Sequence, residues 1–506
     1  MVALLLALGC SAPRDTPLRV TRGPLVALPA NADVHLARVV ELSTNQPTRL
    51  ELDWGDGRAQ WTEWSTEHRV PILGLHADRA YELTAHVYDT HGRSREVSAR
   101  FETEPLAVAL PEMHVLVHDV DAMEPGFTLI GFHFVKGGPT ILVAYDADLE
   151  PVWVFDSADA LSDLQVNARG TLYALQDGRG VELNFLGEYQ RRWTAEPEFD
   201  YDILWEGGRL NYDFLPIDEG FASITFEPVE VDAFPIDYDT PEVLDGPTLI
   251  RTPNIVKMGE DGQQLDKWPL YERLDSTRIG FNSLNWHSGT ESWDWAHSNA
   301  VTQAPDGFVV SLRHQDAVIK LDQKGDLVWI LGNHDGWSAG FERYLLEPIG
   351  DLQWPFHQHG PMVSSDGQVV LFDNHNNGYS PYDVPDELPE NISRIAAFRV
   401  DEVAMTVEQT LSYSETIAGT IYSPVMGDAD WQPTTGNVLA IFASTTQEAG
   451  VGNPDNGWGK NAIRLIEVDP TTAEVALDLR FTSDFAVNED GWWSPRAERF
   501  PGFYPQ

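Results

Sequence analysis

The sequence predicts an all-β protein in which an N-terminal fibronectin-like β-sandwich precedes a six-bladed β-propeller. Short alternating segments, separated by turns rich in Asp and Gly, recur along almost the whole chain of 506 residues. Aromatic residues that pack between sheets are frequent, with 17 Trp and 22 Phe. Sustained 3.6-residue periodicity is nearly absent, so we expect helices to be few and short.

The composition limits the classes of function. There are 33 Lys and Arg residues against 79 Asp and Glu residues, which gives a net charge of −46. Such acidity argues against binding to nucleic acid, because phosphates would not be neutralised. It also argues against binding to anionic lipid by charge alone. A hydrophobic content of 42% is ordinary for a globular protein and excludes disorder as the main state.

Residues 1–18 are expected to be a lipoprotein signal peptide and a polar tether. Residues 2–9 form an apolar run too short to span a bilayer, and Cys10, the only cysteine, follows at once. We expect Cys10 to be lipidated, which would anchor the protein in the bacterial cell envelope, periplasmic or on the outer surface. The alternative is an unrelated apolar N-terminus with a buried cysteine. A single cysteine also excludes an intrachain disulfide.

Residues 19–105 are predicted to form the β-sandwich. Two clear alternating strands are 48–54 and 81–88, and the turns that follow them are 55–57 and 89–92. About 85 residues with this rhythm suit a fibronectin-like domain.

Residues 106–506 are predicted to form the propeller. One pattern recurs there: a strand, a turn with Asp and Gly, a second strand, and often a Trp. Examples are 142–153, 181–193, 255–268 and 317–329. Paired hairpins repeated in this way are typical of propeller blades, and about 400 residues leave room for six. We expect the Trp residues at the blade ends to lie in the core.

The histidines gather in one part of this region. Seven of the 15 lie between His287 and His375, and none follows His375. Five short motifs occur in order around them: Trp295-Ala296-His297-Ser298-Asn299, Ser311-Leu312-Arg313-His314, Trp329-Ile330-Leu331-Gly332, Gln358-His359 and Phe372-Asp373-Asn374. Because loops of neighbouring blades converge at the mouth of a propeller channel, side chains far apart in sequence can meet there. If Arg313 and His314 lie on a strand, they point to opposite faces and only one lines the channel.

These motifs, in this order, resemble the arylsulfate sulfotransferase family of bacterial envelope proteins. The close match covers residues 286–400, and a looser one covers the propeller. The resemblance implies transfer of a sulfuryl group from a small aromatic sulfate donor to a phenolic acceptor, through a sulfated histidine and without a cofactor. It implies that His297 and His359 polarise the sulfuryl oxygens and that Asn299, His314 and Asn374 orient them. Arg394 would replace the arginine that the family carries after its Phe-Asp-Asn turn.

The chain departs from the family at the nucleophile. Characterised members carry the histidine that becomes sulfated in a later blade, where this chain has none. Either His297 or His359 is then the nucleophile, or the protein is a binding module that has kept the architecture and lost the chemistry. Neutral imidazole is a competent nucleophile at sulfur.

Other interpretations remain open at this point. His297 could be a structural histidine, and Arg394 could form an ordinary ion pair. His357 and His359, two residues apart, could be half of a metal site completed by Asp373 or His375, as in a metal-dependent hydrolase or lyase. We expect no metal, because no second ligand pair at a fixed spacing is visible.

Overall fold

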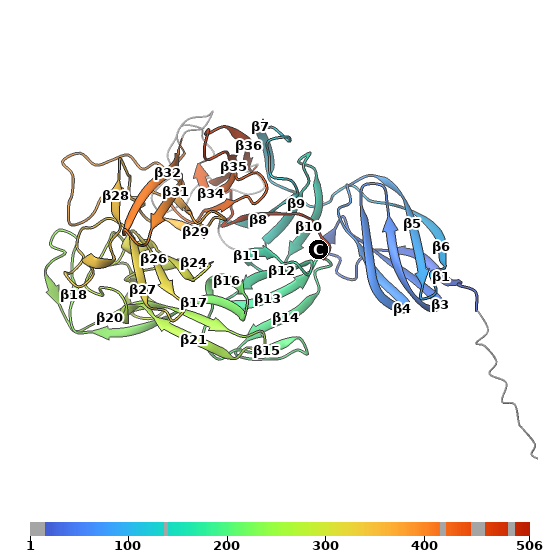
Figure 1. Cartoon of the computed structure of the whole chain (residues 1–506), viewed down its shortest axis with the longest axis horizontal. Helices are drawn as coiled ribbons and strands as arrows, with labels where there is room; N and C mark the ends of the chain where they lie inside the picture. Colours follow the sequence, from blue (N-terminus) through green and yellow to red (C-terminus); the bar gives the residue numbers. More distant parts are fainter. Residues whose placement is uncertain (1–15, 136–139, 415–420, 447–460, 484–490, 506) are drawn as a thin grey trace, which may run out of the picture. The chain divides into compact units, whose positions relative to one another are not determined.

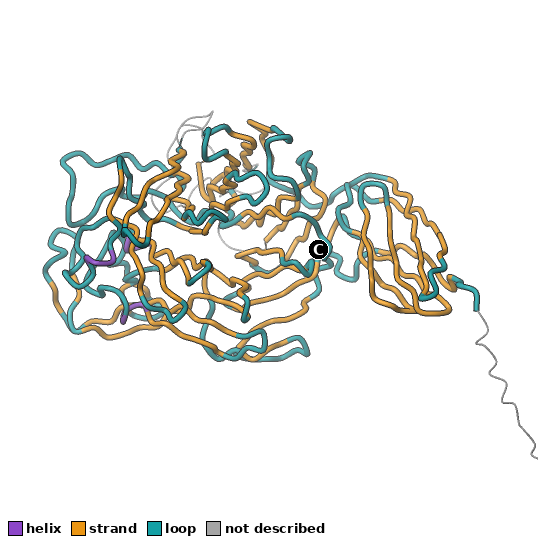
Figure 2. Tube along the Cα trace, viewed as in Figure 1, coloured by secondary structure: helices purple, strands orange, loops and turns teal. Residues whose placement is uncertain are grey.

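The computed structural model describes residues 16–135, 140–414, 421–446, 461–483 and 491–505 (Figure 1). Within these residues the helices are three short 3-10 turns, and the rest is strand and loop (Figure 2). The turns are η1 (Leu270–Glu272), η2 (Arg313–Gln315) and η3 (Glu342–Tyr344). The all-β prediction is therefore confirmed. None of the described helices has the length and apolar character needed to cross a membrane. Cys10 and the predicted signal peptide lie outside the described residues.

The chain divides into two compact units, Met1–Leu106 and Ala107–Gln506. The first has one antiparallel sheet built on a long central strand, β3, which pairs with β4 on one side and successively with β1 and β5 on the other. Its strands are β1 (Val20–Ala27), β3 (Arg38–Asp53), β4 (Arg58–Ile72), β5 (Ala80–Asp89) and β6 (Ser94–Glu102), with a short β2 (Val34–His35). Leu83, Ala85 and Val87 of β5 are buried at every second position, as the alternating pattern requires.

The described part of the second unit contains six sheets of four or more strands and one small hairpin. The first sheet is β10 (Pro151–Ser157), β9 (Thr140–Tyr145), β8 (Phe127–Phe134) and β37 (Trp492–Trp493), with β38 (Ala497–Phe500) also on β8. The second is β11 (Leu161–Val166), β12 (Thr171–Gln176), β13 (Arg179–Asn184), β14 (Tyr189–Thr194) and β15 (Asp202–Leu204). The third is β16 (Asn211–Ile217), β17 (Gly220–Val231), β20 (Thr248–Met258), β23 (Ser292–Trp293) and β22 (Trp286–His287), with β21 (Gln264–Pro269) on β20.

The remaining sheets follow the same plan. The hairpin is β18 (Phe234–Pro235) and β19 (Leu244–Asp245). The fourth sheet is β24 (Ser298–Ala304), β25 (Gly307–Leu312), β26 (Ala317–Asp322) and β27 (Leu327–Gly332). The fifth is β29 (His359–Val363), β30 (Val369–Asp373), β31 (Arg394–Asp401), β32 (Thr406–Tyr413) and β28 (Glu347–Ile349). The sixth is β33 (Asp428–Trp431), β34 (Val438–Thr446), β35 (Asn461–Val468), β36 (Val475–Thr482) and β7 (Glu112–His118).

The two ends of the second unit exchange strands. The early strand β7 completes the sixth sheet, and the late strands β37 and β38 complete the first. The first strands of successive sheets contact one another: β11 with β16, β16 with β24, β24 with β29 and β29 with β33. Strand β38 contacts both β11 and β34, so the circuit closes. Figure 1 labels β11, β16, β24 and β29 near the middle of this unit.

Apolar side chains fill the space between neighbouring sheets. The Trp residues at the strand ends are core residues, as predicted: Trp153, Trp193, Trp268 and Trp329 are each no more than 3% exposed. The Trp193 ring packs on Phe221, with centroids 4.8 Å apart, and its indole N–H donates to the carbonyl of Glu260. Each sheet can bury its two faces only against the adjacent sheets, so it needs apolar contacts of this kind on both faces.

The inner strands are also tied together by buried carboxylates. Asp163 of β11 accepts a hydrogen bond from the backbone N–H of Phe214 on β16. Asp213 of β16 accepts one from Val301 on β24. Glu498 of β38 accepts one from Val166 on β11, at 2.7 Å. Each carboxylate thus satisfies an N–H of the adjacent sheet that no ladder partner serves.

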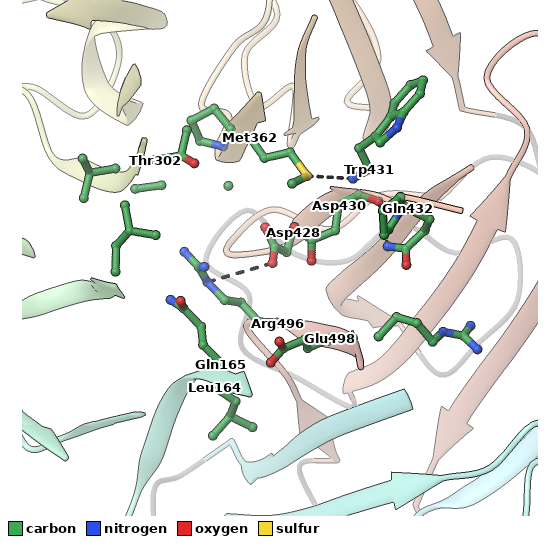
Figure 3. Close-up of a pocket in the computed structure, with 18 residues that line it drawn as sticks. Leu164, Gln165, Thr302, Met362, Asp428, Asp430, Trp431, Gln432, Arg496 and Glu498 are labelled. Atoms are coloured by element: carbon green, nitrogen blue, oxygen red, sulfur yellow. Dashed lines mark hydrogen bonds and ion pairs between the residues drawn. The ribbon is translucent and has the colours of Figure 1, made fainter. Parts of the chain in front are cut away.

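Asp163 and Asp213 lie beside one guanidinium, that of Arg496, and Figure 3 shows Asp428, Asp430 and Glu498 in the neighbourhood of the same side chain. Arg496 pairs with Asp213, lies 3.0 Å from Asp163 and lies 4.0 Å from Asp428, beside a cavity of about 280 Å³. One positive charge cannot offset this many negative charges. Burial raises the pKa of Asp213 to about 7, against the opposing charge of Arg496. Burial and the neighbouring carboxylate of Asp430 likewise hold the pKa of Asp428 well above its usual range.

This cluster predicts a specific dependence of stability on pH. A carboxyl whose pKa is raised in the folded state stabilises the fold while protonated and loses that contribution as pH rises from about 4 to 7. Asp213→Asn should therefore make the free energy of unfolding less dependent on pH, by about 2 kcal/mol between pH 5 and 8. Urea unfolding of both proteins at constant ionic strength measures this difference. Parallel pH profiles for the two proteins would contradict the role given to Asp213.

Candidate active site

A chain of four polar side chains leads to the start of β24. Arg251 donates to Asp294 at 3.0 Å, Asp294 accepts from His297 Nδ1, and His297 Nε2 lies 2.8 Å from the hydroxyl of Tyr212. His297 and Tyr212 adopt φ values of 45° and 64°, a region that is rare for His and exceptional for Tyr. Such strained backbone clusters at functional sites, because packing must hold it in place.

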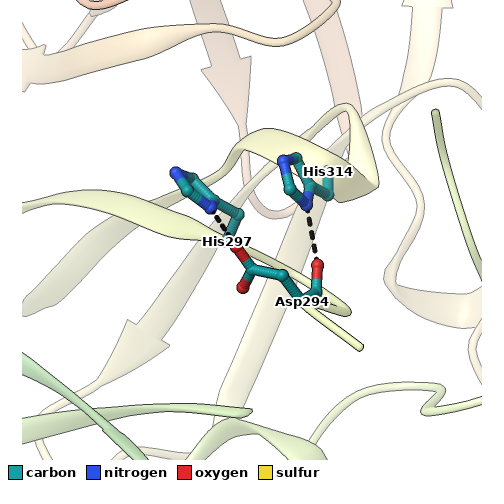
Figure 4. A group of neighbouring side chains, drawn as sticks. All are labelled: Asp294, His297 and His314. Atoms are coloured by element: carbon teal, nitrogen blue, oxygen red, sulfur yellow. Dashed lines mark hydrogen bonds and ion pairs between the residues drawn. The ribbon is translucent and has the colours of Figure 1, made fainter. Parts of the chain in front are cut away.

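His314 lies against this chain as a neutral ring. It stacks on His297 with centroids 4.4 Å apart, and its Nδ1 donates to the backbone carbonyl of Asp294 at 2.7 Å (Figure 4). A carbonyl oxygen only accepts hydrogen bonds, so Nδ1 carries the proton. Burial, followed by the charge of His297, holds the pKa of His314 well below its usual range. The lone pair of His314 is therefore on Nε2.

His359, the first residue of β29, has the same proton arrangement. The Asn374 amide donates to the carbonyls of Ser423 and Met426 at 2.7 and 2.8 Å, which turns its oxygen toward His359. His359 Nδ1 therefore donates to this oxygen, at 2.6 Å. Burial and the charge of Arg313 hold the pKa of His359 well below its usual range. The ring is neutral, with its lone pair on Nε2.

Gly360 positions His359 by allowing a close approach of β29 to β33. Its φ is 51°, and a Cβ at this position would lie 2.2 Å from Asp428 Oδ1. A side chain here would push β29, and with it His359, away from the central carboxylates.

Asn299 and Arg313 complete the group. Asn299 donates to the carbonyl of Gln358 at 2.8 Å, which joins β24 to the residue before His359. The Arg313 guanidinium is buried, and within the described residues it makes a single hydrogen bond, of 3.4 Å, to the carbonyl of Pro424. Burial lowers the pKa of Arg313, although the charge of Asp294 counteracts this. A buried cation with spare donors is suited to an anionic ligand.

A cavity of about 960 Å³ reaches some of these residues. Tyr212, Asn299 and His359 line its inner end, together with Gly360 and Met426. The cavity thus joins the hydroxyl at the end of the Arg251–Asp294–His297 chain to the neutral imidazole of His359.

The structure brings together five of the six residues singled out for catalysis and binding, and leaves Arg394 apart from them. His297 stacks on His314, Asn299 bonds the residue before His359, and His359 bonds Asn374. Arg394 instead donates to Asp373 at 2.7 Å, and its other nitrogens are bonded to Gln353, Ser412 and the carbonyl of Trp354. This is a buried structural ion pair, and the guanidinium near the histidines is that of Arg313.

Arg313 and His314 differ from the strand geometry considered in the sequence analysis. They lie in the 3-10 turn η2, which ends at Asp316 in a left-handed conformation. Because a 3-10 turn does not alternate faces, both side chains are buried at the site. Tyr212 and Arg251 were not identified from the sequence. Neither belongs to a local motif, and only the contact of β16 and β20 with the start of β24 brings them to His297.

The metal arrangement considered for His357 and His359 is not assembled among the described residues. His357 Nε2 lies 2.8 Å from Asn282 Oδ1, and Asp373 is taken up by Arg394 and His375. Asp294, His297 and His314 do offer ligand atoms within 4.8 Å of one another. However, each of the two rings directs its Nδ1–H at Asp294, and Arg251 already neutralises that carboxylate. The group is a hydrogen-bonded network that fits a metal poorly.

Comparison with known proteins shows which family the chain resembles. A model of the family described as arylsulfotransferase (ASST) matches residues 249–492. The arylsulfate sulfotransferase AssT of Escherichia coli O6:H1 is 23% identical over 470 residues, covering 80% of this chain and 71% of the relative. The protein of the same name from Lelliottia amnigena is 21% identical over 482 residues, with the same coverage. Among solved structures, a Bacteroides caccae protein of unknown function matches at 11% identity, over 74% of this chain and 98% of its own chain. The TM-score of 0.35 is too low to show a common fold.

The matched region runs from β20 to β36 and includes Arg251, His297 and His314, together with Asn299 and His359, which line the cavity. The two curated relatives extend the likeness over four fifths of the chain. Over these residues the chain is similar to the arylsulfotransferase family.

Proposed function

We propose that this protein transfers a sulfuryl group from an aryl sulfate to a phenol, with His359 as the nucleophile. The observation that carries the proposal is the neutral His359 ring, whose Nδ1–H is held by Asn374 and whose Nε2 lone pair belongs to a side chain lining the large cavity. A neutral imidazole can attack sulfur without first losing a proton. The curated relatives carry the name of this activity.

We infer that the second unit is a six-bladed β-propeller and the first a β-sandwich. The closed circuit of inner strands and the exchange of terminal strands support the propeller. The change of partner along β3 supports the sandwich. The site would then lie where inner strands of four neighbouring blades converge.

In the first half-reaction the His359 Nε2 lone pair attacks the sulfur of the aryl sulfate. The N–S bond forms, the S–O bond to the ring breaks, and the phenolate leaves with the electron pair of the broken bond. Negative charge on the sulfuryl oxygens meets the Arg313 guanidinium and the amide of Asn299. In the second half-reaction the oxygen of an acceptor phenol attacks the same sulfur, and the S–N bond breaks to restore neutral His359.

Tyr212 is suited to give the departing phenolate its proton. Burial, with the charge of Asp294, raises the pKa of Tyr212 to about 12, so its hydroxyl is protonated at neutral pH. When Tyr212 donates, its oxygen can regain a proton from the imidazolium form of His297, whose Nε2 lies within hydrogen-bond distance and whose Nδ1 faces Asp294. The stacked His314 ring is neutral, so it does not repel that form. The acceptor phenol returns the proton along the same path.

We also propose that residues 1–18 tether the protein to the bacterial envelope through a lipid on Cys10. The apolar run of residues 2–9 before the single cysteine supports this localisation.

Replacing the nucleophile tests the proposal directly. His359→Asn should lower sulfuryl transfer from phenyl sulfate to a phenol by more than about 10³-fold, because no other group then forms the covalent intermediate. The wild-type protein should also be exposed to the donor alone, digested without acid and analysed by mass spectrometry. The sulfuryl adduct is expected on His359. His287→Gln is the matched control, since His287 bonds Thr290 in a separate turn, and it should keep full activity.

The adduct also separates the two candidate functions. A purely binding role is favoured by the lack of a histidine after His375, where the family's nucleophile is expected. An unmodified protein that binds donor without turnover would support that role and contradict transfer. An adduct on a different residue would contradict His359 as nucleophile.

Tyr212→Phe should slow transfer most for donors with poor leaving groups. General acid catalysis contributes about 10²- to 10⁴-fold, and its loss matters most when the phenolate is strongly basic. Rates for a series of ring-substituted phenyl sulfates should depend more steeply on phenol pKa in the variant. Two lines of equal slope would remove Tyr212 from the proton path.

A further inference from the structure

A stack of aromatic rings also lines the large cavity. The proposed reaction does not use these rings. Phe199 and Tyr201 lie with centroids 5.2 Å apart and planes 11° from parallel, and Tyr201 and Tyr189 follow at 5.6 Å and 13°. All three line the same cavity as His359. Phe199 is 52% exposed, although it is an apolar ring with no polar end. Tyr201 lies between the other two rings, so Phe199 is an exposed end of the stack.

This ring stack is held rigidly. The carboxylate of Asp202 accepts hydrogen bonds from the backbone N–H groups of Glu198 and Phe199, at 2.6 and 2.9 Å. It also accepts hydrogen bonds from Nε and Nη2 of Arg192, both at 2.8 Å. The Arg192 guanidinium in turn lies 5.0 Å from the centre of the Phe199 ring. The loop is therefore ordered before any ligand arrives, which lowers the entropy lost on binding.

The charged side chains beside the ring stack are of mixed sign, although the protein as a whole is strongly acidic. An anion can therefore bind next to the stack. Arg179 and Arg209 share a single carboxylate, Asp177, at 3.7 and 3.0 Å. Asp159 on the same lining accepts the hydroxyl of Tyr189 at 3.1 Å, so this edge is mixed and not acidic. An anionic aromatic compound can approach this end without the repulsion that a net charge of −46 causes elsewhere.

The size of the cavity exceeds what a single-ring aryl sulfate fills. Cavities of about 300–1,000 Å³ hold drug-sized ligands, and this one is about 960 Å³. We propose that Phe199, Tyr201 and Tyr189 form a second subsite, which binds the distal ring of an extended aryl sulfate or phenol with two or more linked rings. The placement of the sulfate at His359 rests on the proposed function, but the aromatic subsite is a binding site in its own right.

Phe199→Ala tests the subsite with little risk to the fold, because the side chain is half exposed. For 4-biphenylyl sulfate the variant should raise KM about 5- to 10-fold, the loss expected from one stacked ring, at unchanged kcat. For phenyl sulfate both constants should stay unchanged. Phe199→Tyr should restore the wild-type KM. Trp286→Ala is the matched control, since Trp286 is 55% exposed on β22 and does not line the cavity.

A binding measurement separates failure of the subsite from failure of the proposed function. Calorimetric titration of 4-biphenylyl sulfate into His359→Asn, and into the same variant with Phe199→Ala, should give the same 5- to 10-fold difference without turnover. If no donor is turned over but this difference appears, the subsite stands and the transfer proposal fails. If transfer occurs but Phe199→Ala affects both donors equally or neither, the subsite is overturned.

Discussion

The proposed chemistry depends on the hydrogen bonds that Nδ1 of two buried histidines donates. The Asp294 carbonyl accepts from His314, and the Asn374 amide oxygen accepts from His359. Burial removes the charged form of both rings, and the Nδ1 partners decide which nitrogen keeps the lone pair. Without Asn374 in its fixed orientation, His359 could present an N–H to the cavity and would then be a donor instead of a nucleophile.

His297 differs because its Nδ1 faces a carboxylate. Asp294 accepts a hydrogen bond from it, and Arg251 pairs with the same carboxylate. The site therefore holds one histidine bonded to a carboxylate and one bonded to a neutral amide, and the proposed mechanism gives them different roles. Environments that separate otherwise similar titratable groups are the usual basis for assigning acid and nucleophile roles. Asp428, one of the carboxylates near Arg496, lies against Gly360, so the stability of the inner strands and the position of His359, the proposed nucleophile, are linked.

The sequence predicted much of the architecture and part of the site. The hairpins at 142–153, 181–193, 255–268 and 317–329 are present as β9–β10, β13–β14, β20–β21 and β26–β27, because period-2 burial and Asp-Gly turns are local signals. The order of motifs also brought His297, His314 and His359 to attention. Tyr212, Arg251 and the carboxylate cluster could not be found this way. Their roles arise only where separate sheets meet, and a single Tyr or Asp on a strand carries no signal of its own.

Arg394 is the reverse case, a residue that a sequence motif indicated but whose contacts in the structure differ from the expectation. Its position after the Phe-Asp-Asn turn suggested a sulfate-binding role, yet its guanidinium is bonded to Asp373, Gln353, Ser412 and Trp354. A motif fixes the position of a residue along the chain, whereas the available partners in space decide what its charge does. Arg313, in a turn one sheet earlier, is the buried cation with donors to spare.

The protonation state of His359 is the central claim, and nitrogen NMR of the protein with ¹⁵N-labelled histidine measures it most directly. The account predicts that His359 is a neutral ring with its proton on Nδ1 and that its chemical shifts stay constant between pH 5 and 8. A ring that titrates near the ordinary histidine pKa, or one that carries its proton on Nε2, would contradict the account.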